Sequence, residues 1–513
     1  MVKIITFISI AISAQLLFAN YSKSAESGGV LSWRLNIEQP AEVPPPAKSQ
    51  IIPLAATPQE QQDGLTYLNR QRTAAGLIQY SANTLLDQAA GNHVAYLVTN
   101  NLFGHYEDQD NYPTGFTGVT PTDRGGYVGY KSSVEENLSA GDSTVEESID
   151  GLFSAIYHRF GLLSFYTDEI GIGVERSGSY YYQSAYGYNM GTTQINNLCS
   201  GTSYTGGGGY YYGVCTDSNF RIETNQYLAA REANPQANPA IVRWPYENQP
   251  DSIPVFYEES PDPLPACSVS GYPVSVQFNE VKTGIIVMSS FKLYDRNNSE
   301  IVNTAILTEA TDPNSNFSSR EFALFPLQRL DWGENYSVDF QYTEDGSPKN
   351  LAWSYKTKEL QYPYHKVVNG SNFNVVSDIT YAFYFPPANC NETITNYSIS
   401  YDSGLSINQS GFVDSNTLYF QLSGTNGLSM QVTVSKAGGG SIVYTATLDS
   451  RGNAIFKGDI NGDGKTELAD IILGLQISSG HSVSGINLNG DVNGDGKIDL
   501  VETIYGLKGV SNN

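Results

Sequence analysis

Residues 459–470 read D-I-N-G-D-G-K-T-E-L-A-D, and residues 491–502 read D-V-N-G-D-G-K-I-D-L-V-E. The copies start 32 residues apart, and eleven of the eighteen positions from Gly458 to Leu475 recur unchanged at that offset. A twelve-residue calcium loop presents oxygen ligands at positions 1, 3, 5, 9 and 12, a backbone carbonyl at position 7 and glycine at position 6. The sequence therefore predicts two calcium ions, with ligands Asp459, Asn461, Asp463, Lys465 (carbonyl), Glu467 and Asp470 in the first loop and Asp491, Asn493, Asp495, Lys497 (carbonyl), Asp499 and Glu502 in the second.

Each loop brings four carboxylates close together, which would repel one another without a dication. Calcium binding and folding of this segment are therefore expected to be coupled. The alternative, an acidic turn that binds nothing, is disfavoured because two complete loops stand in register.

A short helix is predicted after each loop. Apolar residues recur there at i, i+4 and i+7, which is one helical face. We expect this face to surround the metal loops, and it consists of Leu468, Ile472 and Leu475 in the first copy and Leu500, Ile504 and Leu507 in the second.

Over residues 458–513 this loop–helix duplication resembles a dockerin. The resemblance implies a small all-α module that plugs into a cohesin-type domain of secreted polysaccharide-degrading assemblies. In dockerins, loop positions 10 and 11 face the partner, and here they are Leu468, Ala469, Leu500 and Val501. These apolar pairs differ from the Ser-Thr pair of many cellulosomal dockerins, and the alternative is a neighbour within the same chain.

The composition indicates a modular extracellular protein. A chain of 513 residues is expected to hold three to five domains. With 52 acidic and 28 basic residues its net charge is −24, which makes nucleic acid and anionic lipid poor partners. The high counts of Tyr (36) and Gly (49) are typical of β-rich extracellular modules.

The N-terminal residues predict export. One lysine and the apolar run I-I-T-F-I-S-I-A-I-S-A indicate a signal peptide within residues 1–25, cleaved after Ala19 or Ala25. No other stretch is long and apolar enough for a membrane span. Residues 26–60 are rich in Pro, Ala, Ser and Gln, which predicts an extended linker.

The four cysteines allow three pairings. Cys199 and Cys215 flank a Gly/Tyr-rich loop and form the natural local pair. Cys267 and Cys390 then either pair across a long span or stay free, and a bond between them is favoured.

The first folded domain is expected at residues 61–250. Periodicity and capping signals predict helices near 65–76, 81–98, from 121 onward, and over 143–158. Strand-like runs follow at 170–176 and 180–188. Helices followed by paired strands form an α+β pattern.

The polar motifs of this domain occur in a recognisable order: N-H-V-A-Y-L-V-T-N-N-L-F-G-H ending at His105, E-N-L-S at 136–139, Y-H-R at 157–159 and I-G-I-G-V at 170–174. This order resembles a bacterial CAP domain, the superfamily of cysteine-rich secretory and plant pathogenesis-related proteins. The resemblance implies an α-β-α sandwich whose cleft holds His105, Glu136 and His158. The position of a second family glutamate is Ala155 here.

Two interpretations of this cleft stay open. Imidazole and carboxylate side chains in one cleft suit zinc with an open coordination position. Alternatively, His105 and His158 are structural, each hydrogen-bonded to Glu136. His93 is expected to be packed rather than a ligand. No nucleophile elbow accompanies Ser139 or Ser154.

Alternating hydrophobicity predicts two all-β sandwich domains, the first Ig-like, at residues 251–360 and 361–450. Their aromatic rows are assigned mostly to packing, and the second sandwich is preferred over the first as a carbohydrate binder.

Taken together, these features favour a secreted modular binding protein over an enzyme. A CAP head would bind a small apolar or cell-surface ligand, and the dockerin-like tail would dock to a cohesin-type partner or become rigid in calcium. The alternative is an extracellular metal-assisted hydrolase of peptide, cell-wall or polysaccharide that uses the His/Glu cleft.

Overall fold

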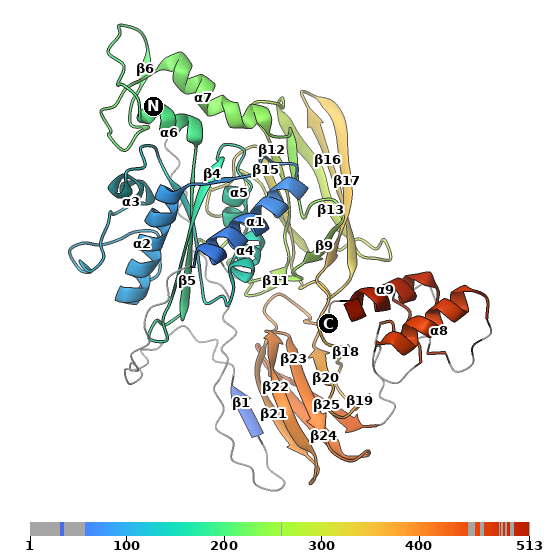
Figure 1. The fold of residues 1–513 in the computed structure, drawn as a ribbon. Helices are drawn as coiled ribbons and strands as arrows, with labels where there is room; N and C mark the ends of the chain where they lie inside the picture. Colours follow the sequence, from blue (N-terminus) through green and yellow to red (C-terminus); the bar gives the residue numbers. More distant parts are fainter. Residues whose placement is uncertain are drawn as a thin grey trace. The chain divides into compact units, whose positions relative to one another are not determined.

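The computed structural model describes residues 31–34, 57–257, 259–449, 457–461, 466–481, 483, 486–487, 490–492 and 497–511. They belong to two compact units, one up to Glu359 and one from Leu360 that also includes residues 31–34 (Figure 1). The predicted signal peptide lies outside the described residues.

The first unit begins with a helical layer and a four-stranded sheet in the order β2-β4-β5-β3. Strand β2 is parallel to β4, and the other neighbours are antiparallel. The elements are α1 (Pro58–Ala74), β2 (Ser81–Ala82), α2 (Thr84–Asn100), α3 (Pro121–Val128), β3 (Glu135–Ala140), α4 (Val145–Ser154), α5 (Ile156–Leu162), β4 (Glu169–Arg176) and β5 (Ser184–Gly191).

The run I-G-I-G-V in β4 decides which helices cover which face of this sheet. Ile170, Ile172 and Val174 lie in one core cluster with residues of α1 and α4. Gly171 and Gly173 face α2, where a Cβ would come within 2.0 Å and 2.4 Å of its backbone. Glycine lets α2 approach closely, so helices cover both faces of the sheet (Figure 1).

A tail follows this sheet. It consists of α6 (Thr193–Cys199), β6 (Tyr210–Tyr211), β7 (Ile222–Glu223) and α7 (Thr224–Ala237). The Cys199–Cys215 disulfide closes its Gly/Tyr-rich loop, as predicted. All four cysteines lie among the described residues and none of them is free, so Cys267 and Cys390 are also oxidised.

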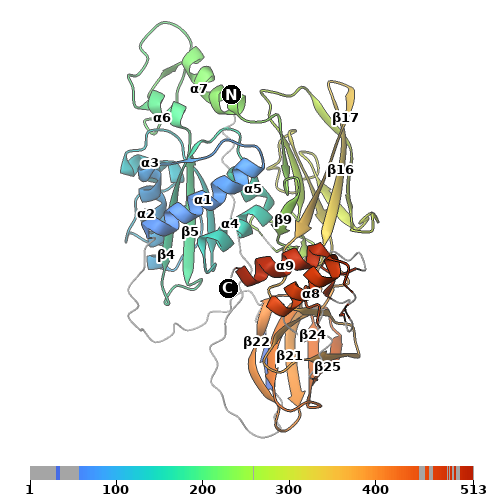
Figure 2. The ribbon, with the colours of Figure 1, turned by 45° about the vertical axis from the view of Figure 1, so that its right-hand side comes forward.

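The first sandwich has two four-stranded sheets, in the orders β14-β15-β12-β8 and β13-β16-β17-β9 (Figure 2). Edge strand β8 and the first two residues of edge strand β9 lie before residue 251, within the range expected for the preceding domain. The strands are β8 (Ile241–Trp244), β9 (Gln249–Ser252), β12 (Val274–Phe278), β13 (Ile286–Tyr294), β14 (Thr304–Leu307), β15 (Glu321–Pro326), β16 (Asn335–Glu344) and β17 (Ser347–Thr357), with β10 (Val255–Phe256) and β11 (Ser270–Gly271) as a separate pair.

A single buried core joins this sandwich to the first domain. Leu68 and Ile149 belong to the same cluster as Trp244 and Phe340. The Phe153 ring of α4 stacks on Trp244 at a centroid distance of 4.3 Å. Residues 57–359 therefore pack as one body, although the sequence predicts two domains here.

The second unit contains the second sandwich, with sheets β1-β21-β24-β25-β19 and β18-β20-β23-β22. Strand β1 pairs with β21 and comes from the segment predicted to be a linker. The strands are β1 (Leu31–Arg34), β18 (Tyr364–Lys366), β19 (Ser371–Val375), β20 (Thr380–Tyr384), β21 (Ile394–Tyr401), β22 (Ser406–Asp414), β23 (Thr417–Ser423), β24 (Ser429–Lys436) and β25 (Ser441–Leu448).

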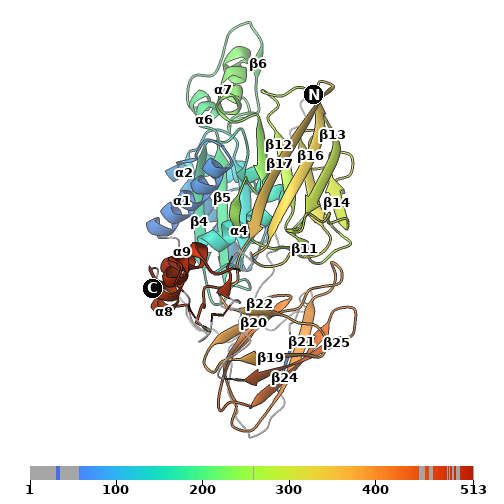
Figure 3. The ribbon, with the colours of Figure 1, turned by 90° about the vertical axis from the view of Figure 1, so that its right-hand side faces the viewer.

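Two helices end the second unit, α8 (Leu468–Ser478) and α9 (Leu500–Ser511) (Figure 3). They approach through glycines, because a Cβ on Gly474 would lie 2.3 Å from the Thr503 hydroxyl and one on Gly506 would lie 3.0 Å from the Ile471 side chain.

Candidate functional site

His105, in the loop after α2, is held by Glu136 of β3. The His105 Nδ1 atom lies 3.0 Å from Glu136 Oε1. The Arg124 guanidinium of α3 donates to both Glu136 oxygens at 2.8 and 2.7 Å and to the His105 carbonyl at 2.9 Å. Burial alone would raise the pKa of Glu136, but Arg124, His93 and His105 lower it to about 2. Glu136 is therefore an ionised carboxylate already engaged by a cation.

His93 of α2 has no exposed surface and is packed, as expected. Its Nδ1 atom lies 2.9 Å from Glu107 Oε1, and its Nε2 atom lies 2.9 Å from the Gly104 carbonyl oxygen. Glu107 also accepts the Thr117 N–H at 2.7 Å. These bonds satisfy both ring nitrogens and fix the loop that carries His105.

His158 of α5 pairs with a different carboxylate. Its Nδ1 atom lies 2.9 Å from Glu259 Oε2, and both side chains are fully buried. Glu259 also accepts the backbone N–H groups of Ile156 and Tyr157 at 2.6 and 3.3 Å. Burial raises the pKa of Glu259. The expectation that Glu136 binds both histidines holds for His105 and is wrong for His158.

Glu259 is a site residue that the sequence analysis missed. It lies in the Pro-rich run 250–265, which reads as a boundary between domains. The role of Glu259 is visible only from its contact with His158 of α5, 101 residues upstream. No local sequence pattern around Glu259 indicates this contact.

The Nε2 atoms of His105 and His158 are buried and accept or donate no hydrogen bond within the described part of the chain. No three His, Cys, Asp or Glu side chains of the described residues are arranged to hold a metal ion. Since Arg124 already neutralises Glu136, a zinc ion at His105, Glu136 and His158 would have to displace that pair. Zinc in this cleft stays a prediction.

The described parts of the two C-terminal loops are organised by the carboxylate at position 12. Asp470 accepts the N–H groups of Ile460, Asn461 and Glu467 at 2.8 to 2.9 Å. Glu502 accepts those of Val492 and Asp499 at 3.1 and 2.7 Å. Both carboxylates are 1% exposed. Four predicted ligands lie outside the described residues, namely Asp463, Lys465, Asn493 and Asp495.

The apolar face of each C-terminal helix points to solvent. Leu468 is 61% exposed and Leu500 is 52% exposed. The expectation that this face surrounds the loops is wrong, because Ile471, Gly474, Thr503 and Gly506 occupy the contact between the helices. The other exposed apolar residues named above are Ala469, Ile472, Leu475, Val501, Ile504 and Leu507.

Comparison with known families identifies the first domain. Residues 65–216 match the family described as CAP, the cysteine-rich secretory protein family. These residues form a CAP domain. The match ends before Glu259, so the CAP domain takes the partner of its His158 from sequence beyond the family pattern.

Solved structures similar to the chain include an outer surface protein from Borrelia burgdorferi (17% identity, TM-score 0.23, 26% of this chain and 94% of that one). Another is an extracellular protein with an SCP domain from Bacillus anthracis (22% identity, TM-score 0.22). A third is a cysteine-rich secretory protein from Staphylococcus aureus (20% identity, TM-score 0.19). The match to each of these last two spans 40% of that protein's length and 26% of this chain. No curated protein matches the chain.

The Borrelia burgdorferi protein is named as an outer surface protein and the Bacillus anthracis protein as an extracellular one. Within the described residues, no helix has the length and apolar character needed to cross a bilayer.

Proposed function

We propose that this chain is an extracellular modular binding protein. Its CAP domain serves as a non-catalytic head for a small apolar or cell-surface ligand, and its C-terminal helix pair attaches the protein to a cohesin-type partner when the loops hold calcium.

The exposed apolar face of α8 and α9 carries this proposal. Leu468, Ile472 and Leu475 recur at a spacing of 32 residues as Leu500, Ile504 and Leu507, and all six are exposed. Contiguous exposed apolar side chains mark protein–protein contacts. Because the two faces are repeats of one another, a partner would meet the same chemistry on both helices.

Buried acidic groups support the calcium requirement. Asp459, Asp470 and Glu502 are each 1% exposed, and burying carboxylates is costly unless a cation or hydrogen bonds compensate. Hard oxygen donors are what calcium prefers. Calcium would supply the positive charge that offsets the repulsion among the carboxylates of each loop.

The CAP domain supports binding rather than catalysis. Ser139 Oγ donates to Asp142 at 2.8 Å and lies 2.5 Å from Ser148 Oγ, with no imidazole among these partners. Activation of a serine nucleophile needs a general base within hydrogen-bond reach. The Nδ1 atoms of the three histidines are engaged by Glu107, Glu136 and Glu259, and none of these imidazoles is a partner of Ser139.

Calorimetry of the full chain tests the calcium step. Titration with calcium chloride is expected to show two binding events. Asp459→Ala and Asp491→Ala should each remove one, while the exposed Asp345→Ala, in a sandwich turn, should remove none. An absence of heat at millimolar calcium would contradict the proposal.

Docking is tested separately with immobilised full chain and a purified cohesin domain. Retention in calcium should be lost with a chelator and in the double variant Leu468→Asp/Leu500→Asp. A matched variant, Val287→Asp/Val302→Asp, changes two exposed apolar residues of the first sandwich and should retain the partner. Equal retention by both variants would exclude this helical face.

A further inference from the structure

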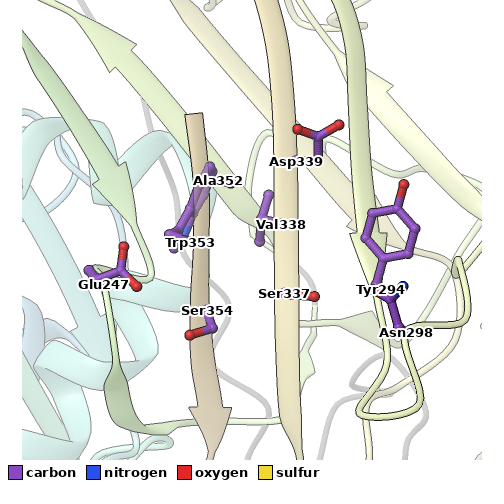
Figure 4. Close-up of a pocket in the computed structure, with 9 residues that line it drawn as sticks. All are labelled: Glu247, Tyr294, Asn298, Ser337, Val338, Asp339, Ala352, Trp353 and Ser354. Atoms are coloured by element: carbon purple, nitrogen blue, oxygen red, sulfur yellow. The ribbon is translucent and has the colours of Figure 1, made fainter. Parts of the chain in front are cut away.

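The first sandwich carries a groove of about 380 Å³ on the solvent face of the sheet β13-β16-β17-β9 (Figure 4). Its floor is formed by small side chains of the two central strands, Ser337 on β16 and Ala352 and Ser354 on β17. In the strand register Ser337 lies opposite Ser354, and Asp339 lies opposite Ala352. The sheet therefore carries short side chains at Ser337, Ser354 and Ala352.

Larger groups stand on both sides of this floor. Tyr294 of β13 lies next to Ser337 in the register, and Asn298 follows it in a turn fixed by bonds to Asp295. On the opposite side Glu247 comes from the turn between β8 and β9. Figure 4 shows the floor residues between Tyr294 and Glu247.

The chemistry of this lining favours a polyhydroxylated ligand. It combines two aromatic side chains, an amide, two carboxylates and three hydroxyl groups. Its volume lies in the range of about 300–1,000 Å³ typical of small-ligand sites. An apolar ligand would leave these polar groups without partners, which is costly, whereas sugar hydroxyls can satisfy each of them.

The charges indicate that the ligand is neutral. Glu247 is paired with Arg243 at 3.4 Å. Asp339 lies opposite Lys292 in the register and accepts a hydrogen bond from Gln341 at 2.9 Å. Arg243 thus compensates Glu247, which weakens the attraction for a basic peptide, whereas Lys292 pairs with Glu300 at 2.8 Å and leaves Asp339 with its bond from Gln341. The oxygens of both carboxylates disfavour an anionic sugar.

We propose that this groove binds a neutral oligosaccharide, with the Tyr294 ring against one sugar face and with Asp339, Glu247 and Asn298 hydrogen-bonded to its hydroxyls. The sequence favoured the second sandwich as a carbohydrate binder, and the groove places this activity in the first. The proposal is independent of the calcium module.

The test uses the full chain and isothermal titration calorimetry with four neutral probes: cellohexaose, laminarihexaose, mannohexaose and chitohexaose. At least one is expected to bind, and hexagalacturonic acid and pentalysine are not. Ala352→Trp, which fills the floor, and Tyr294→Ala should each weaken binding at least tenfold. The matched variant Asn350→Trp, on the same face of the same strand but beyond the groove, should bind as the wild type does.

Thermal melting checks that each variant is folded. Failure of all four neutral probes, binding of pentalysine in their place, or undiminished affinity in Ala352→Trp would overturn the proposal. Binding that persists in a calcium chelator separates this site from the C-terminal module, so that either can fail alone.

Discussion

The imidazole Nδ1 of His158 lies 2.9 Å from the Oε2 of Glu259, a residue 101 positions downstream. The same carboxylate closes the start of α5 by accepting two of its backbone N–H groups. One buried side chain thus ties the CAP histidine to the segment that leads into the first sandwich.

Loss of this carboxylate should destabilise residues 57–359 as a whole. Glu259→Ala leaves His158 and two N–H groups buried without a partner, which is expected to cost about 3–5 kcal/mol. Urea unfolding followed by tryptophan fluorescence measures this. Glu300→Ala, which breaks the exposed pair with Lys292, should cost less than about 1 kcal/mol. Equal midpoints for the two variants would show that the His158 contact is not needed for stability.

The stability of the CAP domain should fall in acid through Glu136. Its pKa is about 2 in the folded protein against an ordinary 4.5, so its ionised form stabilises the fold above pH 4.5. That contribution, about 3 kcal/mol, should be lost as the pH falls from 4.5 toward 2. Urea midpoints from pH 2.5 to 6 should drop more steeply for the wild type than for Glu136→Gln. Parallel profiles would contradict this assignment.

The close approach of α2 to β4 should make Gly173 irreplaceable. A Cβ there would lie 2.4 Å from the carbonyl carbon of Ala90, so Gly173→Ala is expected to cost at least about 3 kcal/mol. Gly91 lies in α2 next to Ala90, and a Cβ built on it has no atom within 4 Å. Gly91→Ala should therefore stabilise the protein by up to about 1 kcal/mol. Thermal melts of the two variants should shift in opposite directions.

The disulfide of the CAP tail should act locally. Cys199 and Cys215 are separated by 16 residues, and opening a loop of this length costs about 3 kcal/mol in the chain-entropy model. The double variant Cys199→Ser/Cys215→Ser should be cleaved by protease within 200–214 far faster than the wild type. The rest of the first unit should resist cleavage as well as it does in the wild type. Unchanged cleavage of this loop would show that α6 and α7 hold it without the bond.

The local patterns predicted the helices α1 to α4 of the CAP domain and two of the four strands of its sheet. Thr120 and Pro121 begin α3 as predicted, and the two strand-like runs became β4 and β5. The expected helix over 143–158 divides at Ala155, whose backbone is extended. The N–H groups freed at that break are the ones Glu259 accepts, so the break depends on a distant residue.

The sequence periodicity identified the apolar face of α8 and α9. The expectation that this face is buried around the loops was wrong, because it is exposed to solvent. A repeat at i, i+4 and i+7 shows which side chains share a face, and not which face is covered. Gly474 and Gly506 let the helices approach through the opposite face. The pairing of His158 was equally beyond local signals, since it joins segments separated by a whole sheet.

The core shared by Leu68, Ile149, Trp244 and Phe340 also limits how these parts can be recombined. An expression fragment ending near residue 250 would strip the partner strands from Trp244 and leave apolar surface in water. A transfer of the CAP domain into another protein should therefore include all residues through Glu359. For the same reason, the CAP domain and the first sandwich are expected to be exchanged between genes as one unit.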